Sequence, residues 1–277
     1  PLGISCFKYL QGYYGSGTTQ FINSLASRAW QNHVVTAIVN VGIDCPFNSP
    51  LAIYQSVVSN MIPPPAPGTD PEDERGIEII FRNYINQKLK QYGIEGGKAV
   101  PAEVRQLIVQ PFTEMYIGAP DMQAAIAIQQ LGKLMLNVAC GGTATPADME
   151  IISWMRGDNI TSRHLRDMGL HKPVKDDSAF NRLKTIIMFM TKRMGMKGIL
   201  IAFDEGTRTV SFRRGSVKQK QAIENLLTMI NDGADGKFPG VMFLYAATPD
   251  FRNEVIQKYP ALNDRIGNIA FKPGSPM

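Results

Sequence analysis

The sequence predicts an α/β fold with a largely parallel sheet, and two observations carry this prediction. Residues 6–61 read as a short strand at 6–10, a glycine-rich turn, a helix that includes 21–29, an apolar β-branched strand at 34–41 and a second helix at 50–61. Two further apolar runs, at 198–203 and 241–248, have the composition of strands buried on both faces. Strands that alternate with helices in this way form parallel sheets.

Between these two groups of strands the pattern changes. Residues 61–71 are rich in proline and predict a stiff linker. From 71 to 195 we find helical periodicity and no convincing strand, with helices expected at 73–92, 101–116, 121–138, 146–155 and 178–194. The pairs Thr145-Pro146 and Asp177-Ser178 are typical of helix starts.

The α/β pattern then resumes. A helix is expected at 217–230, a short helix at 249–256 and a last strand at 268–271. We therefore divide the chain into a first core segment (1–62), a helical insertion (63–197) and a second core segment (198–277). Together these segments are expected to form one discontinuous α/β domain.

Composition excludes several classes of protein. The chain has 277 residues, of which 44% are hydrophobic and 19% are charged, and this excludes a disordered protein. Its apolar runs are too short to span a bilayer, so we expect no membrane contact. Cys6, Cys45 and Cys140 are too far apart to predict a disulfide framework or a zinc cluster, which favours a cytoplasmic protein. The net charge of +5 permits nucleic-acid binding without requiring it.

The turn after the first strand has the spacing of a phosphate-binding loop, G-x4-G-K-[ST], with Thr18 in the lysine position. Its glycines allow backbone N–H groups to surround a phosphate at the N-terminus of the next helix. Thr19 would offer its hydroxyl to Mg²⁺. Taken alone, such a turn also occurs without a ligand. The residues assigned to nucleotide binding are Gly12, Tyr13, Tyr14, Gly15, Ser16, Gly17, Thr18 and Thr19.

A second motif strengthens this interpretation. The apolar run at 199–203 ends in Asp204 and Glu205, which is the form of a Walker B strand. A buried parallel strand brings such carboxylates to the crevice that holds the phosphates. Asp204 would then hold Mg²⁺ together with Thr19, and Glu205 would polarise the attacking water. The alternative is a strand that simply ends in solvated acids.

Two more residues have a catalytic and a structural interpretation. Thr248, at the end of the strand 241–248, either senses the terminal phosphate or caps the helix that follows. Arg265 either acts on the nucleotide of a neighbouring subunit, as an arginine finger does, or is an ordinary surface arginine.

Other polar residues give weaker signals. His33, His164 and His171 lack the spacing of metal ligands. Two basic clusters are either solvated or in contact with DNA phosphates. The first contains Arg208, Arg213, Arg214, Lys218 and Lys220, and the second contains Arg163, His164, Arg166, His171 and Lys172.

With these motifs in order, the chain resembles the P-loop ATP-binding proteins of bacterial phage-exclusion (BREX) systems, a divergent branch of the AAA+ ATPases. The resemblance rests on residues 7–17, 151–157 with Trp154, Arg156 and Gly157, 198–205, and 247–251 together with 262–265. It implies an AAA+-like P-loop NTPase fold of the additional-strand type, here without a C-terminal helical lid. It also implies ATP and Mg²⁺ as ligands, and DNA, a second copy of the chain or other defence subunits as partners.

Three functions follow from this reading. The first is an ATPase domain that couples ATP binding and hydrolysis to DNA-directed phage defence. The second is a pseudo-ATPase that serves as a scaffold or DNA-binding adaptor, because the resembled proteins normally carry lysine where this chain has Thr18. The third is a regulatory switch that exchanges nucleotide slowly and oligomerises when it binds it.

Overall fold

The computed structural model describes residues 5–43, 45–65, 70, 74–94, 100–114, 117–211 and 215–267. Its centre is a five-stranded sheet in the order β1-β5-β4-β2-β3. The strands are β1 (Cys6–Gln11), β2 (Val34–Asn40), β3 (Met61–Ile62), β4 (Gly198–Asp204) and β5 (Val241–Ala247). All neighbours pair in parallel except β2 and β3, which pair antiparallel. The prediction of an α/β protein with a mostly parallel sheet is confirmed, and the fold is compatible with a P-loop NTPase.

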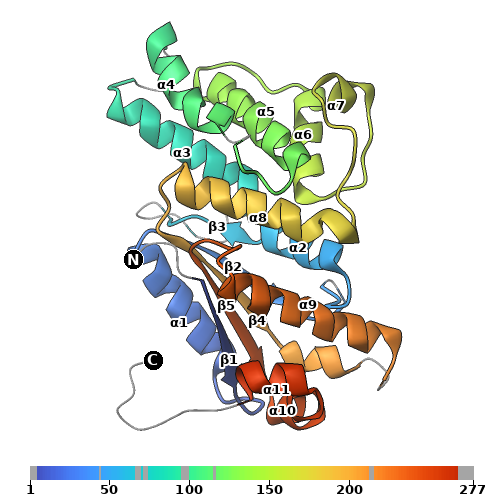
Figure 1. The fold of residues 1–277 in the computed structure, drawn as a ribbon. Coiled ribbons are helices and arrows are strands. Elements are labelled where there is room, and N and C mark those ends of the chain that lie inside the picture. Colours follow the sequence, from blue (N-terminus) through green and yellow to red (C-terminus); the bar gives the residue numbers. More distant parts are fainter. Residues whose placement is uncertain are drawn as a thin grey trace.

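Helices cover both faces of the sheet (Figure 1). On one face lies α1 (Thr18–Gln31), whose Ile22 packs with Leu200 and Ala202 of β4. The other face is covered by α2 (Pro50–Ser59), α8 (Asp176–Lys192) and α9 (Val217–Ala234). Alternate residues of β4, Ile201 and Phe203 among them, belong to the core on this second face. This alternation explains why the strand is apolar at every position from 199 to 203.

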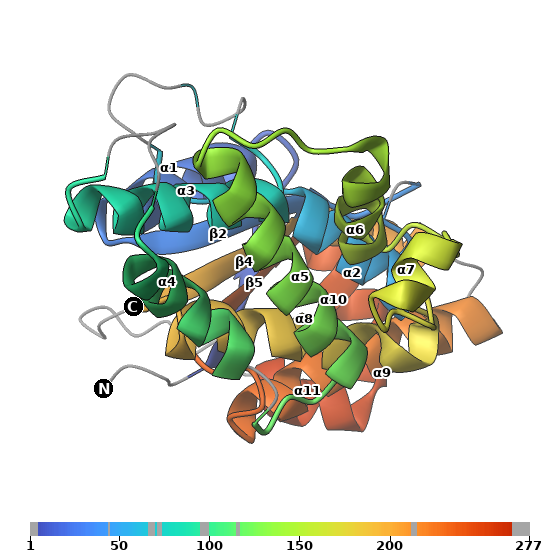
Figure 2. The same cartoon turned by 90° about the horizontal axis from the view of Figure 1, so that it is seen from above.

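The residues between β3 and β4 form a second helical layer (Figure 1, Figure 2). Its helices are α3 (Ile77–Gln91), α4 (Ala102–Thr113), α5 (Met122–Ala139), α6 (Pro146–Arg156) and α7 (Arg163–Asp167), and they lie beyond α2 and α8. Their buried side chains continue the same apolar core that covers the sheet. In the described part of 63–197 there is no strand, as the periodicity predicts.

Some local predictions were wrong. The helix expected at 50–61 ends at Ser59, and Met61–Ile62 form the edge strand β3 instead of the start of the linker. Helix α8 begins at Asp176, and its N-cap is Lys175, not Asp177 or Ser178. The segments α7, η3 (Gly206–Ser211), η4 (Ile256–Lys258) and α11 (Pro260–Ile266) were not predicted, because they are too short to show periodicity. The expected strand at 268–271 lies outside the described residues.

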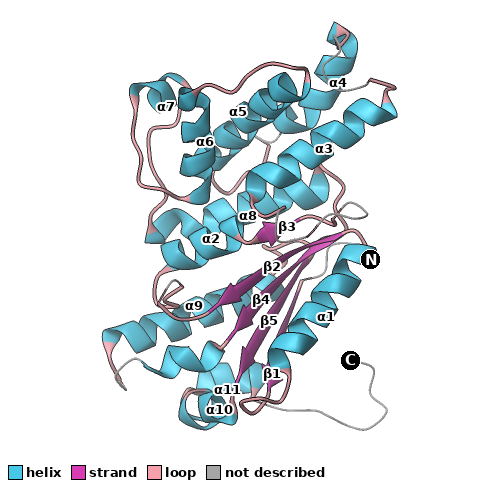
Figure 3. Ribbon diagram, turned by 180° about the vertical axis from the view of Figure 1, so that it is seen from behind, coloured by secondary structure: helices cyan, strands magenta, loops and turns pink. Residues whose placement is uncertain are grey.

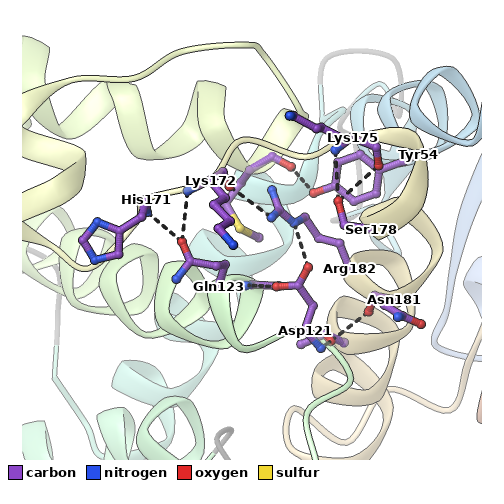
Figure 4. Close-up of polar contacts among 12 residues, drawn as sticks. Tyr54, Asp121, Gln123, His171, Lys172, Lys175, Ser178, Asn181 and Arg182 are labelled. Atoms are coloured by element: carbon purple, nitrogen blue, oxygen red, sulfur yellow. Dashed lines mark hydrogen bonds and ion pairs between the residues drawn. The ribbon is translucent and has the colours of Figure 1, made fainter.

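A buried arginine joins the second helical layer to α8 (Figure 4). Arg182 of α8 is 1% exposed, and its Nε lies 3.3 Å from Oδ2 of Asp121. Its guanidinium carbon is 4.0 Å from the ring centroid of Trp154 in α6. Its Nη2 donates to the carbonyl of Lys172, and Gln123 accepts from the backbone N–H of His171 nearby. The arginine therefore connects α5, α6, α8 and the loop before α8.

The remaining residues of the Trp-Met-Arg-Gly segment also have structural contacts. Arg156 forms an ion pair with Glu78 of α3, and Gly157 follows the last residue of α6 in the left-handed conformation that often ends helices. Trp154 is fully buried beneath Arg182. This segment, one of the four on which the resemblance rests, is thus a packing centre of the helical layer.

Candidate functional site

The predicted phosphate-binding turn connects β1 to α1. Gly17 is the N-cap of α1, with φ 84°, and provides no side-chain cap for the amides of the first turn. A residue with a side chain would be strained at this φ. The first N–H groups of a helix have no partner within it, and the positive end of the helix dipole lies beside them. This end of α1 is therefore suited to a phosphate.

A cavity of about 910 Å³ lies over this turn. The arrowheads of β1, β4 and β5 point to the end of the molecule where α10 (Pro249–Glu254) and α11 lie (Figure 3), and residues at these strand ends line the cavity. The lining consists of Gly12, Tyr13, Tyr14, Gly15, Gly17, Thr18, Thr19, Gln20, Asp204, Glu205, Thr207, Arg208, Ala246, Ala247, Thr248, Asp250 and Glu254. The structure thus brings the two sequence motifs to one site.

The central contact of the site joins α1 to β4. The hydroxyl of Thr19 donates a 2.6 Å hydrogen bond to Oδ2 of Asp204. The other carboxylate oxygen of Asp204 accepts from the backbone N–H of Glu205 at 2.8 Å. Asp204 is only 5% exposed, so both hydrogen bonds help to offset the cost of burying it. The residues predicted to hold a metal are therefore in direct contact.

Glu205 begins the loop after β4 in an unusual backbone conformation. Its φ is +54°, a region that residues other than glycine rarely occupy and that is often found at functional sites. Its carboxylate forms an ion pair with Arg208 in η3, and the backbone N–H of Arg208 donates to the Glu205 carbonyl at 2.9 Å. Arg208 therefore belongs to the cavity, whereas the sequence placed it only in a basic cluster.

Thr248 is held by a residue that the sequence analysis missed. The hydroxyl of Thr207 accepts a 2.7 Å hydrogen bond from the backbone N–H of Thr248, and the two hydroxyls are 2.9 Å apart. Thr248 is the N-cap of α10 by position, but its side chain makes no capping hydrogen bond. The prediction that Thr248 caps the following helix is thus confirmed for its position at the N-cap. It is wrong for the side chain, which makes no capping hydrogen bond.

Tyr9 contacts Thr248 from outside the cavity lining, and the sequence analysis did not single it out. It lies on β1, and its hydroxyl is 3.5 Å from the carbonyl of Thr248. Burial raises the pKa of Tyr9 to about 12, against the opposing charge of Arg252, so the phenol remains a neutral donor. No local pattern marks either Tyr9 or Thr207, because each is defined by a contact with a distant strand end.

Two predicted residues lie apart from the cavity lining. The Ser16 hydroxyl is 3.2 Å from that of Thr18, but Ser16 is not among the lining residues. Arg265 lies on α11, where its Nε donates to Asn231 at 2.6 Å and its Nη1 donates to the carbonyl of Ala261. It does not line the cavity of its own chain.

The cavity suits a nucleotide with a divalent cation. Its volume lies within the range of ~300–1,000 Å³ that is usual for small-molecule sites. Mg²⁺ prefers oxygen ligands, retains several waters and is completed by substrate phosphates, so Thr19 and Asp204 could serve as its protein ligands. Across the described residues, no group of three or more His, Cys, Asp or Glu could hold a metal by itself.

The three cysteines, all within the part of the chain that the structure describes, form no disulfide. Cys45 is buried, and burial raises the pKa of its thiol to about 11, which makes it a poor nucleophile. Cys6 and Cys140 are free and partly buried. Within the ranges that the structure describes, a helix able to cross a membrane by its length and apolar character does not occur.

One of the comparisons with known proteins found a match. Comparison with curated proteins and with solved structures gave no match. A family profile described as "BREX system ATP-binding protein BrxC/D" matches residues 2–275, which is nearly the whole chain. The family description implies ATP binding. The chain belongs to the BREX system ATP-binding protein BrxC/D family.

Proposed function

We propose that this chain is a Mg²⁺-dependent ATPase domain of the additional-strand, AAA+-like type. The order of the strands supports the fold assignment, because β5 lies between the phosphate-loop strand β1 and the acid-tipped strand β4. P-loop NTPases of the additional-strand class are defined by such a strand between the phosphate-loop strand and the acid-tipped strand. The division into a discontinuous core and a helical insertion is part of the same proposal.

The contact between Thr19 and Asp204 is the observation that carries the proposal. Residues 12–19 would surround the phosphates with backbone N–H groups, and Thr19 and Asp204 would hold Mg²⁺. When bound, the ion would neutralise charge on the outer phosphates. Glu205 would accept a proton from the attacking water, and Thr248, fixed by Thr207, would hydrogen-bond the terminal phosphate or that water.

Two measurements test this function. Titration with a fluorescent ATP analogue is expected to give saturable binding that weakens when EDTA removes Mg²⁺. Release of inorganic phosphate is expected to fall by at least ~10²-fold in Glu205→Gln, as for loss of a general base. The absence of binding, both in this chain and in Thr18→Lys, would exclude a nucleotide site.

Thr18 supports a second candidate, a pseudo-ATPase that serves as a scaffold or adaptor. A lysine at this position would supply a charge on the outer phosphates that Thr18 cannot supply. Saturable ATP binding together with phosphate release that is equal in the native chain and in Glu205→Gln would favour the scaffold. A switch would instead oligomerise on adding ATP, which size-exclusion chromatography with and without ATP detects.

We further propose that DNA binds to exposed basic residues. Arg166, His171 and Lys172 are exposed in and after α7, and Lys218 and Lys220 are exposed in the first turn of α9. Neutralising phosphates with such side chains makes affinity fall steeply with salt. We expect duplex DNA to bind with this salt dependence and Lys218→Glu with Lys220→Glu to weaken it. If ATP hydrolysis is coupled to this DNA binding, the chain would act on DNA in phage defence.

Arg265 is proposed to act across a subunit boundary. It lies on a short exposed helix and does not line its own cavity, which is what a residue acting on a neighbour requires. Mixing Arg265→Ala with Glu205→Gln subunits is the test. Restored phosphate release would support a shared site, because in some mixed pairs one subunit supplies Glu205 and the other supplies Arg265 to the same nucleotide. Inactivity of all mixtures would contradict it.

A further inference from the structure

The residues that line the cavity carry more negative than positive charge. Its acidic lining residues are Asp204, Glu205, Asp250 and Glu254. Arg208 is the one lysine or arginine among the lining residues that the structure describes. A polyphosphate that enters this cavity would meet four carboxylates, with Thr18 at the position where a P-loop carries its cation. Without a lysine at position 18, binding of a polyphosphate depends more strongly on the positive charge of Arg208.

The fold holds Arg208 at the strand ends. Its backbone N–H donates to the Glu205 carbonyl, which fixes η3 directly behind β4. Its side chain runs beside Gly42, where an added Cβ would lie 2.9 Å from Nη1. A side chain at position 42 would thus force the guanidinium to move. The side chain of Arg208 is 54% exposed, so it can exchange one partner for another at low desolvation cost.

In this structure Arg208 forms an ion pair with the carboxylate of Glu205. A guanidinium presents N–H groups in a planar fork that fits phosphate as well as carboxylate. The carboxylate that binds Arg208 is also the proposed proton acceptor. While Glu205 accepts from Arg208, the lone pair in that contact is not available to a water molecule. Glu205 and an entering phosphate therefore compete for the same cation.

We propose that Arg208 is the phosphate-binding cation of this site and that it exchanges Glu205 for the terminal phosphate when ATP binds. This rests on the proposed function and adds a residue to it. Arg208 compensates for the absence of lysine at position 18, and its departure from Glu205 frees the carboxylate. Binding of a terminal phosphate and release of the base are then one event, which ADP does not cause.

Affinity for a non-hydrolysable ATP analogue, measured by calorimetry with Mg²⁺, tests this without relying on turnover. Arg208→Gln is expected to weaken the ATP analogue on the order of 10- to 100-fold, as for a lost hydrogen bond to a charged group, and to change ADP affinity by less than ~3-fold. Arg208→Lys keeps the positive charge and is expected to lose less affinity for the ATP analogue than Arg208→Gln. Arg193→Gln removes another partly exposed arginine, ion-paired with Glu114 at 2.9 Å and absent from the cavity lining, and is expected to bind as the native chain does.

Two combined variants test the exchange of partners. Glu205→Gln removes the ion pair with Arg208 and is expected to strengthen binding of the ATP analogue about 3- to 10-fold, but only while Arg208 is present. Thr18→Lys is expected to restore affinity for the ATP analogue when it is combined with Arg208→Gln. In the native chain the same substitution is expected to raise this affinity much less. Such non-additivity is the signature of groups that act on one ligand.

The outcomes separate the two proposals. If the native chain binds the analogue and Arg208→Gln binds it equally well, the inference is overturned and the proposed function stands. An equal effect of Glu205→Gln with and without Arg208 also overturns the exchange. If neither the native chain nor Thr18→Lys binds the analogue, the proposed function fails and the inference fails with it. Thermal melts of each variant show whether it is folded.

Discussion

The hydroxyl of Thr19 and the carboxylate of Asp204 are joined by a hydrogen bond although 185 positions separate them in the sequence. The contact exists because Thr19 lies in the first turn of α1 and Asp204 is the last residue of β4. Parallel strands end at the same edge of a sheet, so β1 and β4 deliver their following loops to one crevice. The long helical layer leaves this edge open, since it lies beyond α2 and α8 (Figure 1).

Removal of the Thr19 hydroxyl should weaken the Mg²⁺-dependent part of ATP binding and leave the Mg²⁺-independent part unchanged. In Thr19→Ala, we expect ATP affinity in the presence of Mg²⁺ to fall by about 10-fold, as for a lost hydrogen bond near a charge. Affinity in EDTA is expected to remain unchanged, because the backbone N–H groups are still present. Calorimetric titrations with and without Mg²⁺ measure both values.

Ser24→Ala provides the control for this variant. Ser24 lies on the same helix, and its exposed hydroxyl donates to the carbonyl of Gln20. We expect its affinity to match that of the native chain under both conditions. A Thr19→Ala protein that keeps the full Mg²⁺ effect would contradict the placement of the metal.

Residues with local signals could be predicted from the sequence. The apolar run of β4 marks a strand buried on both faces, and the glycine spacing marks the turn before α1. Thr145 was recognised as a helix start, and the structure shows it as the N-cap of α6 with a capping box to Asp148. In each case the responsible residues are within a few positions of one another.

Residues defined by distant contacts could not be predicted. Thr207 and Arg208 lie in a short 3₁₀ segment without periodicity, and their roles depend on Thr248 and Glu205. Residues 61–62 form a strand only because β2 offers an open edge beside them. The pattern of the sequence there, an apolar pair before prolines, fits a linker equally well.

The hydroxyl pair at the end of β5 should control turnover more than binding. Thr207→Val keeps the shape of the side chain but leaves the backbone N–H of Thr248 without its acceptor. We expect kcat for ATP hydrolysis to fall by about 10-fold and KM to change little, because Thr248 is proposed to act on the terminal phosphate. Unfolding in urea should show a loss of about 1 kcal/mol for the lost hydrogen bond.

Thr207→Ser separates this role from general packing. Serine retains the hydroxyl but lacks the methyl group, so we expect it to keep most of the turnover that valine loses. Thr228→Val, in which an exposed threonine of α9 loses a hydrogen bond to the carbonyl of Glu224, should leave turnover unchanged. Equal kcat in the valine and serine variants would argue against a positioning role for the hydroxyl.

The buried arginine of the helical layer should be important for stability. Arg182→Met leaves the carboxylate of Asp121 without its charged partner and removes the cation over Trp154. Removing one partner of a buried pair costs about 3–5 kcal/mol, and we expect a loss of this size in urea unfolding. Combining Arg182→Met with Asp121→Asn should recover part of it, because no unpaired charge then remains.

Arg193→Met provides the comparison for this measurement. Its ion pair with Glu114 is partly exposed, and pairs of this kind contribute at most about 1 kcal/mol. We expect the two single variants to differ clearly in their urea midpoints. Equal midpoints would mean that the cluster in Figure 4 contributes no more than a surface pair.

The acid sensitivity of the chain should depend in part on Asp232 of α9. Burial alone would raise the pKa of Asp232, but hydrogen bonds and charges from Lys184 and Lys237 outweigh it and hold the pKa below its ordinary value. A carboxyl group with a lowered pKa stabilises the folded state fully above its unfolded value of ~4, and this contribution is lost as pH falls through the folded value. Lys237 has a raised pKa because of Asp232 and Asp235, so its contribution is lost only as pH rises through that folded value, above ~10.4.

Melting temperatures of the native chain and of Asp232→Asn across pH test this sign. We expect the native chain to melt higher by a constant margin from pH ~5 to 8, and the margin to shrink below pH ~4, where the native aspartate also becomes neutral. Asp235→Asn provides the control, because the side chain of Asp235 is 59% exposed and forms an ion pair with Lys237. Its margin should be small throughout. A margin for Asp232→Asn that grows on acidification would show that burial, not the two lysines, determines the pKa of this carboxyl group.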